Sequence, residues 1–151
     1  KLTEDDMHPG LFGDTKLEHL DIMGNPDMLN FDAAALFPGS SGQQLEELTL
    51  VNCGLTGIGG DSGTNFHGLL SLETVYLNEN DFGDGIAEVA FNGLVRLTHL
   101  YLESSGLLSL PAGVFSGKSR ASGPTGNGTN FIPTLTTTCR PSCVGETLSA
   151  W

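Results

Sequence analysis

The residues best suited to chemistry gather in one acidic stretch, NENDFGDGIAEV, at positions 78–89. Hard cations such as Ca²⁺ bind several oxygen ligands at once. The side chains that could supply these oxygens are Asn78, Asn80, Asp81, Asp84 and Glu88. Their spacing argues against a calcium loop, because Phe82 takes a ligand position and no glutamate closes the loop where bidentate ligation needs it. We therefore expect a solvated acidic rim and no bound metal.

A repeated leucine spacing decides where such side chains can lie. Residues 97–110 follow the pattern LxxLxLxxSxLxxL, in which leucines two apart suit a short strand and leucines three apart suit a turn. The pattern begins at Leu17, Leu45, Leu72 and Leu97, at intervals of 28, 27 and 25 residues. Self-similarity at this period indicates leucine-rich repeats, which bury their leucines only when neighbouring coils stack.

These repeats resemble those of extracellular-type leucine-rich repeat proteins over roughly residues 7–117. The motif LPAGVFSG at positions 110–117 is similar to the LPxGVF signature of jawless-vertebrate variable lymphocyte receptors and related ectodomains. The resemblance implies an α/β solenoid with short parallel β-strands on its concave face and loops, 3-10 turns and short helical turns on its convex face. It also implies binding through the protein surface. We expect about four to five coils in residues 1–117.

Residues that alternate with the strand leucines are predicted to point outward, because successive side chains of a strand face opposite sides. In register they form three columns on the concave face. The first contains His19, Glu47, Thr74 and His99. The second contains Asp21, Thr49, Tyr76 and Tyr101, and the third Met23, Val51, Asn78 and Glu103. The two tyrosines, about 5 Å apart, favour either aromatic anchors of an acidic binding surface or plain cross-strand packing.

The same columns argue against metal binding and catalysis. His19 and His99 share a column but are separated by roughly 15 Å, too far to bind one zinc ion. No serine, histidine and acidic residue fall on adjacent coils as a triad, and no nucleophile has a base beside it. Cys53 replaces the Asn or Ser of the other repeats and is predicted to be a buried structural thiol. We expect a non-enzymatic protein without a cofactor.

Charge narrows the class of partner. The 151 residues include 6 Lys and Arg against 18 Asp and Glu, which gives a net charge of −12. Nucleic acid and anionic lipid are disfavoured, because both need cationic side chains to neutralise their phosphates. No apolar run approaches the roughly 18 residues of a membrane helix. The expected partner is a protein, and a basic one suits this charge.

The periodic pattern ends at Gly117, and residues 118–151 are predicted to be an irregular flank rich in Gly, Pro, Ser and Thr. Asn127 begins an N-glycosylation sequon, and residues 134–138 either carry O-linked sugar or form an extended strand on the last coil. Cys139 and Cys143 either form a disulfide with each other or belong to a larger Cys-rich module. These features favour an extracellular or cell-surface location.

The beginning of the chain resembles the end of a coil, with no Cys-rich cap and no signal peptide, so we expect a segment of a longer protein. The leading hypothesis is a protein-binding segment of an extracellular or cell-surface protein that contacts its ligand through the acidic concave face. The alternative is a structural segment of an extracellular fibre, matrix or appendage that assembles through its open solenoid ends.

Overall fold

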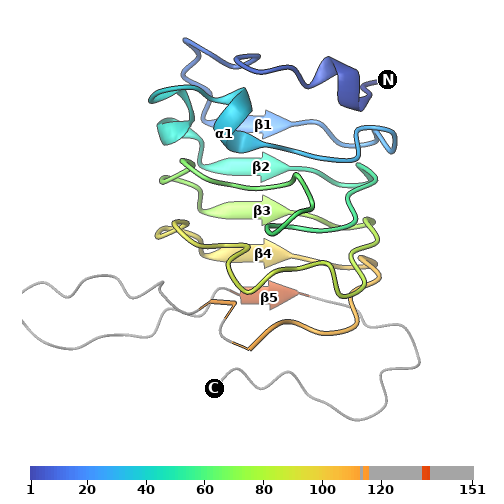
Figure 1. The fold of residues 1–151 in the computed structure, drawn as a ribbon. Helices are drawn as coiled ribbons and strands as arrows, with labels where there is room; N and C mark the ends of the chain where they lie inside the picture. Colours follow the sequence, from blue (N-terminus) through green and yellow to red (C-terminus); the bar gives the residue numbers. More distant parts are fainter. Residues whose placement is uncertain (113, 116–133, 137–151) are drawn as a thin grey trace, which may run out of the picture.

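A computed structural model describes residues 1–112, 114–115 and 134–136 of the chain. Within these residues, five short strands form one parallel sheet in the order β1-β2-β3-β4-β5 (Figure 1). The strands are β1 (His19–Asp21), β2 (Glu47–Thr49), β3 (Thr74–Tyr76), β4 (His99–Tyr101) and β5 (Thr134–Thr136). The first four lie where the repeated leucine pattern predicts strands.

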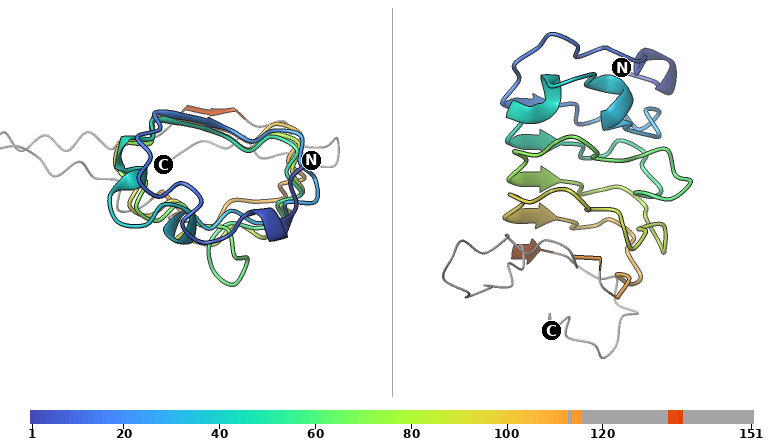
Figure 2. Two further views of the ribbon diagram at one scale, coloured as in Figure 1. Left: turned by 90° about the horizontal axis from the view of Figure 1, so that it is seen from above. Right: turned by 60° about the vertical axis from the view of Figure 1, so that its left-hand side comes forward.

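The strands pair in the predicted register. Leu20 lies opposite Leu48, and Val75 lies opposite Leu100, so equivalent residues of successive repeats are neighbours across the sheet. Each strand connects to the next through a long return segment, as parallel strands require. Seen along the stack, the successive turns lie over one another (Figure 2).

The return segments carry the short helical turns and loops that the sequence predicts. The segment between β1 and β2 contains the one-turn helix α1 (Ala33–Leu36) and the 3-10 turn η2 (Ser41–Gln44), whereas the 3-10 turn η1 (Glu4–Asp6) precedes β1. Asp32 caps α1, since its Oδ1 accepts a hydrogen bond from the backbone N–H of Ala35 at 3.1 Å. No helix in the described residues is long and apolar enough to cross a membrane.

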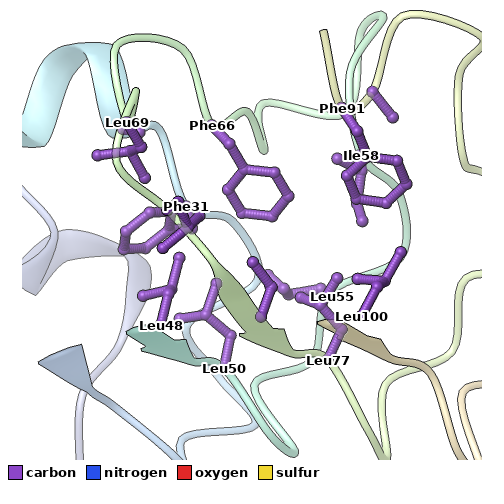
Figure 3. Close-up of a cluster of buried hydrophobic side chains, with 14 of the residues drawn as sticks. Phe31, Leu48, Leu50, Leu55, Ile58, Phe66, Leu69, Leu77, Phe91 and Leu100 are labelled. Carbon is purple, nitrogen blue, oxygen red and sulfur yellow. The ribbon is translucent and has the colours of Figure 1, made fainter. Parts of the chain in front are cut away.

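The leucines fill the space between the sheet and the return segments (Figure 3). Leu50, Leu77 and Leu102 are fully buried. The backbone N–H of Leu50 donates to Tyr76 O, and that of Leu77 donates to Tyr101 O, both at 2.9 Å. These bonds confirm that the three leucines occupy equivalent places in successive coils.

A series of phenylalanines forms a second layer of the core, behind the leucines. The ring centroid of Phe66 lies 6.3 Å from that of Phe31 and 6.1 Å from that of Phe91. At the N-terminal end, Phe12 stacks on Phe37 with centroids 4.9 Å apart. Because each ring touches the ring of a neighbouring coil, this layer joins the coils along the whole stack.

Asparagine and its substitutes hold the turns after β1, β2, β3 and β4. The side-chain Nδ2 of Asn80 donates to Leu50 O at 2.8 Å and to Leu77 O at 2.9 Å. Cys53 is fully buried at the equivalent place, and its thiol donates to Ile22 O at 3.4 Å. Burial raises the pKa of this thiol, so it stays protonated. The predicted structural role of Cys53 is confirmed.

Strand β5 lies within the flank that is predicted to be irregular. It pairs with β4 in parallel, His99 lying opposite Thr134 and Tyr101 opposite Thr136. The structure therefore agrees with the extended strand on the last coil over Thr134–Thr136.

Candidate functional site

The structure places the twelve predicted binding residues on one surface, the side of the sheet opposite to the leucines. Strand pairing fixes the first two columns, with Glu47 opposite Thr74 and Thr49 opposite Tyr76. Backbone hydrogen bonds beyond the strands extend this register, since Gly24 N donates to Val51 O at 2.9 Å and Asn52 N donates to Asn78 O at 3.0 Å. We call this surface the sheet face: His19, Asp21, Met23, Glu47, Thr49, Val51, Thr74, Tyr76, Asn78, His99, Tyr101 and Glu103.

The sheet face is open to solvent at its ends and half-buried in the middle. His19, Asp21 and His99 are exposed, and Met23 is 56% exposed. The side chains of β2 and β3 that belong to the face are half-buried against one another. The face therefore presents side chains on a hydrogen-bonded parallel sheet, and its exposed strand residues lie on β1 and β4.

Three aromatic rings with nearly parallel planes mark the part of the sheet face on β3 and β4. Tyr76 and Tyr101 stack with ring centroids 4.6 Å apart and planes 8° apart. His99 lies 6.4 Å from Tyr101 with an interplanar angle of 9°. This geometry confirms cross-strand packing of the tyrosines. Half-exposed tyrosines on a rigid support are also the residues that interfaces favour.

Acidic groups surround these rings. Burial, and then the nearby Glu47 carboxylate, raise the pKa of the Tyr76 phenol above its ordinary value of 10.0. Glu103 follows Tyr101 by two residues on the sheet face, and its backbone N–H donates to the side-chain Oδ1 of Asn78 at 2.9 Å. The Asn78 side chain thus joins the segment after β3 to the segment after β4.

A second acidic row lies directly before the strands and was missed by the sequence reasoning. It consists of Glu18, Glu46 and Glu73, whose backbone carbonyls and N–H groups are hydrogen-bonded from coil to coil. Arg96 forms an ion pair with the carboxylate of Glu73. The signal was available, because each glutamate directly follows the first leucine of its repeat. The sequence reasoning used only the alternation of side chains along each strand, and these glutamates lie one residue before the strands begin.

The oxygen-bearing side chains of the acidic stretch 78–89 do not converge. Asn80 is buried and its side chain is hydrogen-bonded in the turn after β3, whereas Asn78 belongs to the sheet face. Asp84 is exposed, and its Oδ1 accepts a hydrogen bond from Ser109 Oγ at 3.2 Å. Within residues 1–112, 114–115 and 134–136, no three His, Cys, Asp or Glu side chains are close enough to share a metal ion.

The remaining predicted sites lie outside the described residues. These are the sequon at Asn127 and the cysteines Cys139 and Cys143. His19 and His99 are described, and they lie on β1 and β4, with two strands between them.

Comparison with known protein families gives one finding for this region. Residues 43–107 match the family described as Leucine rich repeat, a range that contains β2, β3 and β4. No curated protein is significantly similar to the chain in sequence.

Proposed function

Since residues 43–107 are leucine-rich repeats, a class that generally mediates binding between proteins, we propose that this chain is a non-enzymatic protein-binding segment. Its ligand contacts the sheet face. The observation that carries the proposal is the stacked pair Tyr76 and Tyr101, half-exposed on a rigid sheet and surrounded by Glu47 and Glu103. Aromatic side chains on a rigid support supply much contact area at little entropic cost.

The architecture that we propose for residues 1–117 is an α/β solenoid with the sheet face on its concave side. The parallel sheet, the leucine period and the coil-to-coil contacts of the phenylalanines support it. In such a solenoid, the sheet face is the surface that curves around a ligand. A partner would then touch several coils at once.

The partner suited to this surface is a basic protein. The chain has a net charge of −12, and the sheet face carries Asp21, Glu47 and Glu103 but neither lysine nor arginine. Opposite charges on two proteins accelerate their encounter and select against wrong partners. Association should therefore slow as salt is added.

An extracellular or cell-surface location is part of the proposal. The sequon at Asn127 and the neighbouring Cys139 and Cys143 suit the secretory pathway. Secretion from cultured animal cells, followed by enzymatic removal of N-linked glycan, tests this point. A mass shift that the Asn127→Gln variant lacks is the expected result.

Site-specific photo-crosslinking tests the binding face even when the partner has not been identified. A photoreactive benzoylphenylalanine would replace His99 on the sheet face or, as the matched control, the exposed Asn92 of a return segment. We expect a defined crosslinked product from position 99 and not from position 92. The triple variant Glu47→Lys, Glu103→Lys, Tyr76→Ala should abolish that product while leaving the fold intact.

Crosslinking of the same partner from position 92, or from the triple variant with undiminished yield, would reject the sheet face as the binding surface. Circular dichroism of each variant shows whether the fold is retained. The result then concerns binding alone.

A second candidate function is assembly through the end of the stack. Among the described residues, β1 pairs only with β2, and Leu17 and Leu20 beside this edge are only partly buried. An unpaired edge can accept a further strand from another chain. Light scattering over a range of concentrations separates the two functions, because an assembling segment forms multimers and a binding segment stays monomeric.

A further inference from the structure

One face of the Tyr76 ring stacks on Tyr101, and the opposite face is directed toward β2. Tyr76 stacks on Tyr101 at 4.6 Å, which is about the spacing of neighbouring strands, so the stacking direction runs across the strands. The other face of the Tyr76 ring therefore looks toward its partner on β2, Thr49. A threonine side chain is too short to cover a phenol ring. In the described part of the chain, Tyr101 is the one aromatic residue in contact with Tyr76.

Two carboxylates lie beside Thr49. Asp21 lies opposite Thr49 on β1, and Glu47 precedes Thr49 by two residues on the same side of β2. The Oδ1 of Asp21 accepts a hydrogen bond from Met23 N at 3.0 Å, which holds the carboxylate in place and leaves Oδ2 for a ligand. Neither acid forms an ion pair with any residue that the structure describes. We call the group of Asp21, Glu47, Thr49 and Tyr76 the Thr49 slot.

The Glu47 carboxylate is close enough to the Tyr76 phenol to help raise its pKa, which supports a shared environment for the ring and the acid. The slot thus combines the aromatic face of Tyr76, the short polar side chain of Thr49 and two negative charges. An uncharged aromatic ligand would fill the aromatic face but would place no cation against the acids. A compact ammonium would meet the acids but would cover little of the ring.

We propose that the Thr49 slot binds an arginine side chain of the protein partner, an inference that rests on the proposed function. The guanidinium lies flat against the open face of Tyr76, above Thr49, and donates N–H hydrogen bonds to Glu47 and Asp21. Guanidinium is planar, always charged and weakly hydrated, and it carries five donors, whereas the lysine ammonium is a strongly hydrated point charge. Arginine therefore fits both parts of the slot.

Calorimetry with matched peptides tests the proposal. The probes are acetylated octapeptide amides that repeat Gly-Arg, Gly-Lys or Gly-citrulline, measured against the full chain. We expect the arginine peptide to bind more tightly than the lysine peptide, by about two- to fivefold for one ring contact. The citrulline peptide, which keeps the shape but lacks the charge, should bind weakest.

Variants show which residues cause the preference for the arginine peptide over the lysine peptide. Tyr76→Leu removes the ring, and Thr49→Tyr fills the slot by extending the ring stack, so each should equalise the arginine and lysine affinities. Asp21→Asn with Glu47→Gln should weaken both cationic peptides. Its matched control, Asp84→Asn with Glu88→Gln, changes the net charge equally at exposed positions outside the sheet and should weaken them less.

Equal affinities of the wild-type chain for arginine and lysine, no binding of either peptide, or a preference that survives both Tyr76→Leu and Thr49→Tyr would overturn the proposal. Crosslinking from position 99 reports separately on the sheet face. If that crosslink persists while the arginine preference is absent, the proposed function stands and the arginine slot fails. If the crosslink is absent from the sheet face, the proposed function itself fails.

Discussion

The side chain of Asn80 joins two neighbouring coils through the backbone of Cys53. Its Oδ1 accepts a hydrogen bond from Cys53 N at 3.0 Å and another from Leu55 N at 3.1 Å. Its Nδ2 donates to backbone carbonyls of both coils. One buried amide thus satisfies backbone groups that water cannot reach.

Replacing this amide should be costly. Asn80→Ala leaves the N–H groups of Cys53 and Leu55 buried without an acceptor, and we expect a loss of roughly 2–5 kcal/mol in the free energy of unfolding. Urea denaturation followed by circular dichroism measures it. The exposed Asn92→Ala is the control and should change stability by less than about 0.5 kcal/mol. Equal effects of the two changes on the free energy of unfolding would contradict the stabilising role of the Asn80 hydrogen bonds.

Because the Cys53 thiol is buried, the free energy of unfolding should fall as the pH rises into the alkaline range. Burial raises its pKa in the folded state above the ordinary value of 9.0. A group with a raised folded pKa contributes its stability fully below the unfolded pKa, and that contribution is lost as pH rises through the folded pKa. We expect the difference in unfolding free energy between the wild type and Cys53→Ala to shrink above pH 9. A difference that is constant from pH 7 to pH 11 would argue against the buried thiol.

The phenylalanine layer should carry much of the coupling between coils. Phe66 contacts the rings of both Phe31 and Phe91, and its side chain is 2% exposed. Phe66→Ala should destabilise the fold by about 3–5 kcal/mol, because it leaves a cavity between coils. Leu70→Ala, at a site 47% exposed, should cost less than about 1 kcal/mol. Thermal unfolding of the two variants provides the comparison.

Adjacent residues after β3 test the two faces of the sheet. Leu77 is fully buried, whereas Asn78, the next residue, belongs to the sheet face. Leu77→Asp places a charge in the apolar interior and should unfold the stack. Asn78→Asp should be tolerated, because its carboxylate can still accept the hydrogen bond from Glu103 N. A folded Leu77→Asp variant would show that the register is wrong.

Most of the sheet and of the sheet face could be predicted from the sequence, because the leucines determine both. Once Leu48, Val75 and Leu100 are in register, alternation assigns their neighbours to the opposite side. The expected distance of about 5 Å between Tyr76 and Tyr101 agrees with the observed 4.6 Å. The burial of Cys53 followed from its position in the repeat.

Other features could not be predicted, because they depend on contacts between irregular segments. The insertion PGSSGQQ lengthens the path from Phe37 to Leu45 and hides the place of Phe37 in the phenylalanine layer. Strand β5 follows a stretch without periodicity, so the sequence predicted a strand on the last coil only as one of two alternatives and did not determine its register with β4. The sequence also does not show which face of the Tyr76 ring is directed toward Thr49, because this depends on the orientation of the ring.

A repeated left-handed backbone position after each of the strands β1 to β4 was also missed, and it supplies the last prediction. Gly24, Asn52, Glu79 and Ser104 are equivalent residues with φ of 77°, 53°, 59° and 52°. For a residue with a Cβ, this conformation costs about 1–2 kcal/mol relative to the right-handed region. Gly24→Ala should therefore destabilise the chain by about 1 kcal/mol, although a Cβ at Gly24 would meet no atom within 4 Å.

The reverse substitution should act in the opposite direction. Glu79→Gly relieves the backbone strain but adds conformational freedom to the unfolded chain, so we expect a gain of at most about 1 kcal/mol. Chemical denaturation of both variants measures the pair. Glu88→Gly, at an exposed residue outside this position, is the matched control and should not stabilise the chain. Stabilisation by Gly24→Ala together with destabilisation by Glu79→Gly would show that the turn after each strand does not require the left-handed conformation.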